Sequence, residues 1–305
     1  MSLHHDGGFN VKEFTGSYVV NITPMTPDQE LDEKGLQDNI EWSIAMGTAG
    51  ICCVGSTGEF VSLTREERLR VARITVDQVK NRIPVLVGTA AETTRDTIEY
   101  TRHAREIGAD GVLIINPYYC KPSSDEIYEH FRAVSEAVDI PIMLYNNPHT
   151  SGIDMSDELM LRICTLKNIR HVKEASGEIR HVRNLLRFSN GAIRVFCGSD
   201  DLVLESFLMG ACGFISVCGN IIPDISQQLF QHVQENEIEK ARRLYERILP
   251  LCEMIERSGK MVQVVKAAVN KIGHAAGPCR LPRLPLTQAE DEALESLLRD
   301  MGLLS

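Results

Sequence analysis

The feature that most constrains this chain is a regular alternation of short apolar runs with longer amphipathic segments from about residue 16 onward. Eight of the runs have the composition of strands, and most are continuously apolar, which is typical of parallel strands covered on both faces. They are residues 17–24, 50–55, 84–89, 111–117, 140–147, 170–175, 194–199 and 213–219. Each run is followed by a segment that is expected to be a helix.

Two kinds of helix boundary signal lie between these runs. Thr64 with Glu67, and Ser123 with Glu126, fit the capping box, in which a hydroxyl and a Glu three residues later satisfy backbone N–H groups. Glycines follow three of the expected helices: Gly47, Gly108 and Gly210.

Eight strand–helix units in one series predict an α/β chain that closes into a (β/α)₈ TIM barrel. An open, doubly wound sheet is the alternative. We expect the barrel to span residues 14–236 and a C-terminal helical extension, packed on the barrel, to span residues 237–305. Residues 1–13 are expected to be a disordered tail outside the fold.

Composition excludes some classes of partner. The formal net charge of −10 argues against nucleic acid and anionic membranes, because both require a basic surface. The cysteine count, nine, is odd, and no Cys-x-x-Cys pair occurs, which favours reduced cysteines in a cytoplasmic protein. No apolar run reaches the roughly 18 residues that a membrane-spanning helix needs.

Polar or small residues follow five of the predicted strands, where the active sites of such barrels lie. They are residues 55–59 (GSTGE), 116–119 (NPYY), 145–148 (YNNP), Lys173 and residues 198–201 (GSDD). The GSTGE turn can present backbone N–H groups to an anion such as a carboxylate, although an ordinary turn would explain it equally well. No Gly-x-Gly-x-x-Gly fingerprint and no His/Cys cluster is present, so neither a dinucleotide nor a metal ion is expected.

Lys173 lies inside an apolar strand, where a charged amine is costly. It could extend to water or pair with Glu174, but side-chain alternation sends Glu174 to the opposite face. If Lys173 points into the barrel, burial disfavours the ammonium form, and a neutral amine can form a Schiff base with a ketone. His171 would share the inward face, as a hydrogen-bonded core residue.

Imine chemistry needs a group that transfers protons. Tyr145, one strand away from Lys173 at the same level, is the candidate, with Ser56 and Tyr119 as relay partners. Packing at the rim of the barrel is the alternative role for Tyr119.

With these motifs, the chain resembles the dihydrodipicolinate synthase / N-acetylneuraminate lyase family of class I aldolases. The resemblance covers nearly the whole chain and rests on five segments: residues 55–59, 116–119, 145–148, 173–177 (KEASG) and 213–217 (GFISV). It implies a TIM barrel with no cofactor, which acts on a 2-oxo acid and an aldehyde.

The resemblance also implies the role of each residue. Lys173 would form the imine with pyruvate or a pyruvate-yielding 2-oxo acid, and Tyr145 would be the acid/base. Tyr119 would reach the site of a neighbouring subunit, which implies a dimer at least and a homotetramer in the common case. The residues that match the pyruvate pocket are Gly55, Ser56, Thr57, Gly198 and Ile215.

The half of the site for the second substrate matches neither subgroup. Thr150 stands where the synthases carry an arginine that binds the carboxylate of the aldehyde. A threonine hydroxyl cannot replace a guanidinium group, which is charged and binds a carboxylate through two hydrogen bonds. Asp200 and Asp201 match an acidic pair that binds sugar hydroxyls in the lyases, whereas Val217 follows the synthase pattern.

We therefore expect a lyase or aldolase that forms a lysine imine with pyruvate. The alternatives are an N-acetylneuraminate-lyase-like enzyme, or an aldolase or dehydratase of 2-keto-3-deoxy sugar acids. A catalytically silent barrel that binds a 2-oxo acid is the alternative outside the enzymes, although Lys173, Tyr145 and Tyr119 are all present.

Overall fold

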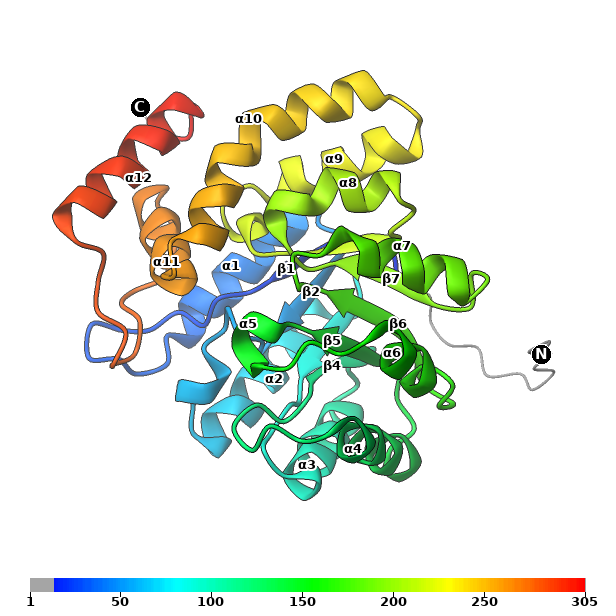
Figure 1. Ribbon diagram of the computed structural model, residues 1–305. Coiled ribbons are helices and arrows are strands. Elements are labelled where there is room, and N and C mark those ends of the chain that lie inside the picture. The colour runs from blue at the N-terminus through cyan, green and yellow to red at the C-terminus, as the bar shows by residue number, and fades with distance from the viewer. Residues whose placement is uncertain (1–13, 305) are drawn as a thin grey trace.

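The computed structural model describes residues 14–304 and shows a closed barrel of eight parallel strands, in which each strand pairs with the next and β8 returns to β1 (Figure 1). The strands are β1 (Gly16–Val20), β2 (Gly50–Cys53), β3 (Val85–Gly88), β4 (Gly111–Ile115), β5 (Ile142–Asn146), β6 (Ile169–Glu174), β7 (Arg194–Cys197) and β8 (Gly213–Ser216). The predicted TIM barrel is confirmed, and the open sheet is excluded. Almost every strand residue is buried, as expected for parallel strands inside a ring of helices.

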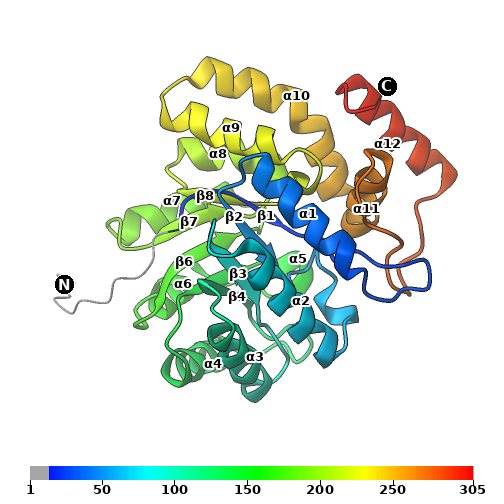
Figure 2. The same ribbon diagram turned by 180° about the vertical axis from the view of Figure 1, so that it is seen from behind.

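Helices follow the strands around the outside of the barrel (Figures 1 and 2). They are α1 (Glu33–Ala45), α2 (Arg65–Val79), α3 (Thr94–Glu106), α4 (Ser124–Ala137), α5 (Pro148–Ser151), α6 (Asp157–Ile163), α7 (Ile179–Phe188), α8 (Val203–Leu208), α9 (Pro223–Gln234), α10 (Ile238–Arg257), α11 (Met261–Lys271) and α12 (Gln288–Asp300). Short 3₁₀ helices lie at η1 (Phe60–Ser62), η2 (Asp200–Leu202) and η3 (Cys218–Asn220).

The helix boundaries follow the predicted signals. Both capping boxes are present: the side chains of Thr64 and Ser123 accept from the backbone N–H groups of Glu67 and Glu126, whose carboxylates accept in return. The three glycines expected at helix ends have φ angles of +86°, +86° and +104°, in the left-handed region that favours glycine: Gly47, Gly108 and Gly210.

Helices α10, α11 and α12 form the C-terminal extension, and α10 packs along α9 (Figure 1). The extension is fixed to the barrel by a buried ion pair, in which Lys266 Nζ lies 2.7 Å from Glu59 Oε1. The other oxygen of Glu59 accepts the backbone N–H of Arg280 (3.1 Å). Because Glu59 ends the GSTGE turn after β2, α11 helps to hold this turn in place.

The boundary at residues 236 and 237 stays a prediction, and the expected tail (residues 1–13) lies outside the described residues.

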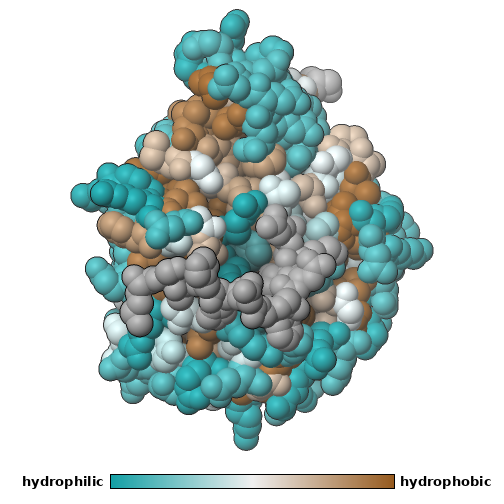
Figure 3. All heavy atoms as spheres, turned by 90° about the vertical axis from the view of Figure 1, so that its right-hand side faces the viewer, coloured by the Kyte–Doolittle hydropathy of each residue, from teal (hydrophilic) through white to brown (hydrophobic). Residues whose placement is uncertain are grey.

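Hydrophilic side chains dominate the face shown in Figure 3, and apolar residues gather there in separate areas. Within residues 14–304, no helix is long and apolar enough to cross a membrane.

Candidate active site

Lys173 and Tyr145 lie side by side at the C-terminal end of the barrel. They are paired positions on the neighbouring strands β6 and β5, and both are buried. Lys173 Nζ lies 4.1 Å from the centre of the Tyr145 ring. Among residues 14–304, no carboxylate lies within salt-bridge distance of Lys173. The amine is therefore in the barrel, and not bound to an acid.

Glu174 confirms the expected alternation along β6. Its carboxylate accepts the side-chain N–H of Asn146 (2.9 Å) and the backbone N–H of Ser176 (2.7 Å). Burial raises the pKa of Glu174 above its ordinary value. The carboxylate next to Lys173 in sequence thus belongs to a separate polar network.

A cavity of about 460 Å³ opens at the ends of the strands, and Lys173 and Tyr145 lie in its wall. Its size suits a small ligand. Seven of the predicted residues line it: Ser56, Thr57, Tyr145, Thr150, Lys173, Gly198 and Asp201. The structure therefore brings together five polar groups and one close-approach glycine around a single amine.

The hydroxyl groups in this cavity have hydrogen-bonding capacity left. Asn147 Nδ2 donates to the Tyr145 phenol oxygen (2.8 Å), so the phenol proton stays available for another acceptor. Ser56 Oγ is buried and has no hydrogen-bond partner among the described residues. A buried hydroxyl without a partner is costly, and a bound ligand would satisfy it.

Gly198 leaves room for the lysine. A Cβ atom at this position would lie 2.8 Å from Lys173 Cε and 2.6 Å from Ala175 Cβ, closer than such atoms normally approach. The absence of a side chain at residue 198 therefore allows Lys173 to occupy its place in the cavity wall.

Four of the predicted site residues do not line the cavity. The carbonyl of Gly55 accepts the N–H of Phe60 (3.4 Å) and helps to close the turn. Ile215 is fully buried in β8, beside Tyr18 of β1. Tyr119 is 87% exposed on the surface of the chain, so its ring is not packed against the rim of its own barrel.

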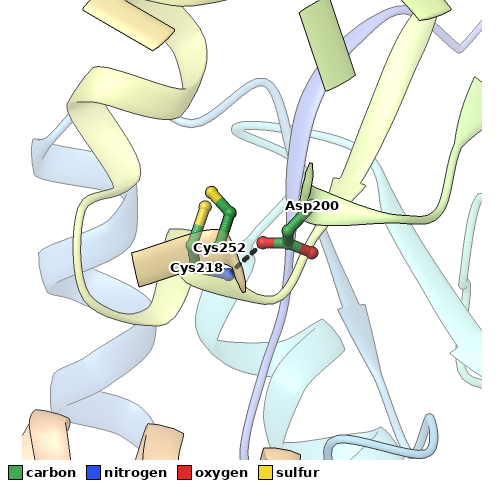
Figure 4. Close-up of side chains that lie close together, drawn as sticks. All are labelled: Asp200, Cys218 and Cys252. Atoms are coloured by element: carbon green, nitrogen blue, oxygen red, sulfur yellow. Dashed lines mark hydrogen bonds between the residues drawn. The ribbon is translucent and has the colours of Figure 1, made fainter. Parts of the chain in front are cut away.

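Asp200, the fourth, lies outside the cavity, and its sugar-binding role stays a prediction. It is fully buried, and its carboxyl group accepts the backbone N–H groups of Cys218 (2.6 Å) and Val217 (3.2 Å). Figure 4 shows it facing the turn that carries Cys218, with the Cys252 thiol from α10 nearby. Burial raises the pKa of Asp200 well above its ordinary value. Asp200 holds the turn after β8, whereas its neighbour Asp201 reaches the cavity.

Within residues 14–304, two groups of side chains have the types and spacing of metal ligands, with ligand atoms within 4.8 Å of one another: Asp200, Cys218 and Cys252, and His232, Glu235 and Glu237. None of the six lines the cavity that contains Lys173. The carboxyl oxygens of Asp200 already accept backbone N–H groups. The chemistry around Lys173 thus draws on side chains other than these.

His171 is the hydrogen-bonded core residue that was predicted. It is buried below the site, accepts the backbone N–H of Phe14 at Nε2 (3.5 Å), and its ring lies 4.9 Å from that of Phe14. Burial lowers the pKa of His171 to about 4, so the ring is neutral at physiological pH.

The segment after β5 contributes His149 and Thr150 to the cavity wall. The N–H of Thr150 donates to Asn147 Oδ1 (3.1 Å), and its side chain lines the cavity. His149 Nε2 donates to the carbonyl of Ser176 (3.0 Å), which holds that ring against the loop after β6.

Sequence reasoning missed the contribution of the C-terminal extension. The end of α10 and the start of α11 line the cavity with Ile255, Glu256, Arg257, Gly259 and Met261. No local signal marks these residues, because they lie in an ordinary amphipathic helix and the turn after it. Only the packing of α10 on the barrel brings them to the site.

The comparisons with known proteins agree over nearly the whole length of the chain. The Dihydrodipicolinate synthetase family matches residues 13–301. The 4-hydroxy-tetrahydrodipicolinate synthase of Ralstonia nicotianae is 36% identical, and the alignment covers 96% of this chain and 99% of that protein. The synthase of Geotalea daltonii is 37% identical, with 95% of this chain and all of that protein covered.

Two of the similar solved structures contain pyruvate. One is a chloride-inhibited dihydrodipicolinate synthase from Acinetobacter baumannii, with a TM-score of 0.92, 35% identity and coverage of 96% of this chain and 100% of that one. The other is a prophage protein of the dihydrodipicolinic acid synthase family from E. coli K12, with a TM-score of 0.91, 33% identity and coverage of 95% and 99%. The chain belongs to the dihydrodipicolinate synthetase family of class I, Schiff-base-forming lyases.

Proposed function

We propose that Lys173 forms an imine with pyruvate, or with a 2-oxo acid that yields pyruvate, and that the chain uses this imine to make or break a carbon–carbon bond to an aldehyde. The observation that carries the proposal is the buried Lys173 amine, which has no acidic partner among residues 14–304 and lies 4.1 Å from the Tyr145 ring. The solved relatives that hold pyruvate support it.

The proposed reaction begins when the neutral amine of Lys173 attacks the C2 carbonyl of pyruvate. The carbonyl oxygen leaves as water after it has received protons, and Tyr145 is the group that delivers them. The positively charged imine then withdraws electrons, so that C3 can pass a proton to the Tyr145 oxygen, which gave its own proton to the leaving water, and the imine becomes an enamine. The enamine carbon attacks the aldehyde carbon, the aldehyde oxygen takes up a proton, and water releases the product from Lys173. Cleavage follows the same steps in reverse.

Ser56 and Thr57 are proposed to hold the pyruvate carboxylate. Both line the cavity after β2, and the unpartnered Ser56 hydroxyl is a free donor there. The imine is itself the electron sink, so the proposed chemistry requires neither a metal ion nor a nucleotide.

Tyr119 is proposed to complete the proton relay of a second copy of the chain. Its side chain is exposed and does not reach the cavity of its own chain. A phenol at this position can act on Tyr145 only across an interface, which requires a dimer at least; a homotetramer built from two dimers is our proposal. The free cysteines agree with a reducing cytoplasm as the location.

A second candidate is an aldolase or dehydratase of hydroxylated 2-oxo acids, as in N-acetylneuraminate lyase or the 2-keto-3-deoxy sugar-acid enzymes. The observation that favours it is Asp201 in the cavity wall, together with Thr150 in place of a carboxylate-binding arginine. A dehydratase would release an intact carbon chain, whereas an aldolase would release pyruvate.

The test is a panel of 2-oxo sugar acids and of aldehydes with pyruvate, assayed for pyruvate release or consumption. We expect turnover with at least one pair and a loss of about 1,000-fold or more in Lys173→Ala, because a covalent step is removed. Lys167→Ala is the matched control, since Lys167 forms an exposed ion pair with Asp139 (3.2 Å) away from the cavity. Full activity of Lys173→Ala would contradict the proposed mechanism.

A further inference from the structure

Tyr119 lies in a loop that has few contacts within its own chain. Residues 116–123 join β4 to α4, and residues 119–121 are exposed. Among residues 14–304, the only hydrogen bonds made by residues 118–121 are those to Glu92. An exposed loop outside secondary structure depends on such anchors to keep one conformation. The position of Tyr119 therefore depends on Glu92.

The carboxylate of Glu92 holds two consecutive backbone groups of this loop. It accepts the N–H of Tyr118 at Oε1 (3.0 Å) and the N–H of Tyr119 at both oxygens (3.1 Å each). Hydrogen bonds to a charged acceptor are stronger than those between neutral groups. No lysine or arginine among the described residues lies within ion-pair distance of Glu92, so its carboxylate serves these two N–H groups alone.

The segment that carries Glu92 is itself firmly held. Residues 89–91, between β3 and Glu92, are buried. The guanidinium group of Arg68 donates to the carbonyl of Ala90 (2.8 Å). Arg68 is fixed in turn, because its guanidinium carbon lies 3.9 Å from the centre of the Tyr100 ring, in a cation–π contact. Glu92 therefore connects the loop after β4 to a fixed point after β3.

Tyr118 and Tyr119 are neighbours with different surroundings. The Tyr118 ring is half-buried and meets the Phe60 ring edge-on, with the ring centres 6.0 Å apart and an angle of 84° between the planes. Tyr119 is exposed. One packed ring and two anchored N–H groups thus fix the backbone of the loop, and the phenol of Tyr119 extends away from its own barrel.

We infer that Glu92 is a positioning residue, which holds Tyr119 where its phenol can reach the site of a second chain. The inference rests on the proposed function, because it concerns the relay that is assigned there to Tyr119. Glu92 does not line the cavity that contains Lys173, so it acts on the reaction only through Tyr119. Loss of Glu92 from one chain therefore impairs the site of the other chain and leaves its own cavity intact.

The first test measures exchange of the pyruvate methyl protons with D₂O by NMR, without any aldehyde. Glu92→Ala should lower kcat for exchange by about 10-fold or more and change KM for pyruvate by less than about twofold, because it impairs proton transfer and leaves the pyruvate pocket intact. Glu92→Gln keeps one acceptor oxygen and should recover part of the loss. Glu129→Ala, which breaks an exposed ion pair with Arg132 within α4 (2.6 Å), is the matched control and should behave as wild type.

The second test identifies the chain in which Glu92 acts, with pairs of variants that are unfolded and refolded together. Glu92→Ala with Lys173→Ala should recover exchange, because every mixed dimer has one site with Lys173 of one chain and an anchored Tyr119 of the other. Glu92→Ala with Tyr119→Phe should not recover, because neither chain supplies an anchored Tyr119. The mass of the refolded species shows that mixed dimers are present.

The inference is overturned if the results of the two mixtures are reversed, since Glu92 would then act on the cavity of its own chain. It is also overturned if Glu92→Ala exchanges protons at the wild-type rate. A monomeric Glu92→Ala would overturn it as well, since Glu92 would then maintain the interface and not the place of Tyr119. Thermal unfolding checks that each variant is folded, and Glu92→Gln replaces Glu92→Ala in the mixtures if the alanine variant is not.

A mixture of Lys173→Ala and Tyr119→Phe separates this inference from the proposed function. If this mixture recovers exchange and the mixture of Glu92→Ala with Lys173→Ala does not, only the inference about Glu92 fails. If it does not recover although mixed dimers form, the proposed relay across the interface fails, and the inference fails with it.

Discussion

Lys173 Nζ lies 4.1 Å from the centre of the Tyr145 ring, and the two residues are paired across neighbouring strands of the barrel. Strand pairing fixes this relationship, because both side chains point to the same face at the same level. A rigid scaffold thus holds an amine beside a phenol at the bottom of a cavity of about 460 Å³. This is the arrangement that imine formation requires: a nucleophile and a proton carrier with little freedom to separate.

Removal of the Tyr145 hydroxyl should slow imine formation more than it weakens pyruvate binding. We expect Tyr145→Phe to lower the rate of pyruvate methyl exchange by about 100-fold or more, because general acid–base catalysis is lost. The Asn147→Ala variant keeps the phenol and removes the N–H that it accepts (2.8 Å), together with the acceptor of the Thr150 N–H (3.1 Å), so its loss should be smaller. Equal rates for Tyr145→Phe and the wild type would show that another group carries the protons.

Mixing of two inactive variants should test the role of Tyr119. If each site needs Lys173 of one chain and Tyr119 of another, Lys173→Ala and Tyr119→Phe should each have low activity alone. A mixture that is unfolded and refolded together should recover activity, because every mixed dimer contains one complete site. Recovery is measured as pyruvate turnover per site against each variant refolded alone. The presence of mixed dimers is checked by their mass. If mixed dimers form and activity does not recover, Tyr119 acts within its own chain.

Lys266→Met should destabilise the chain strongly. The substitution removes the partner of Glu59 at 2.7 Å and leaves this buried carboxylate with only the longer contact to Arg283 (3.7 Å), and the loss of a buried partner costs about 3 kcal/mol. Lys260→Met is the control, because its ion pair with Glu290 is partly exposed and such pairs contribute about 1 kcal/mol or less. The free energy of unfolding is measured with urea. Similar values for the two variants would contradict the view that this pair ties α11 to the turn after β2.

Acid should destabilise the chain through its buried histidines. Burial lowers the pKa of both His171 and His130 to about 4 in the folded chain, whereas the ordinary value is 6.5. The unfolded chain binds these protons first, so stability is lost as the pH falls from 6.5 to about 4, by up to roughly 3 kcal/mol for each group. Urea unfolding at a series of pH values should show a shallower decline in His171→Asn than in the wild type. Parallel declines would show that His171 does not titrate in this way.

The fold could be predicted from the sequence because its signals are local and repeated. Continuous apolar runs identified the strands, and hydroxyl–glutamate pairs such as Thr64 and Glu67 identified helix starts. The two-residue period of a strand was enough to predict that Glu174 lies on the face opposite Lys173, whereas the inward direction of Lys173 was left open and is given by the structure. These inferences need only the two-residue period of a strand and the geometry of a closed sheet.

The outer part of the site could not be predicted in this way. Glu256 and Arg257 reach the cavity because α10 packs against the barrel, a long-range contact without a local signal. Asp200 and Asp201 are neighbours with the same side chain. Asp200 is buried and accepts hydrogen bonds from backbone N–H groups, whereas Asp201 faces the cavity. Which of them reaches the cavity depends on the turn after β8, which lies in another part of the sequence.

The most direct test of the Lys173 mechanism is reductive trapping. The enzyme is treated with sodium borohydride in the presence and absence of pyruvate, and its peptides are mapped by mass spectrometry. If Lys173 forms the imine, activity is lost only with pyruvate, and the peptide that contains residue 173 gains the mass of one reduced pyruvate adduct. An adduct on a different lysine, or full activity after treatment with both reagents, would contradict the mechanism.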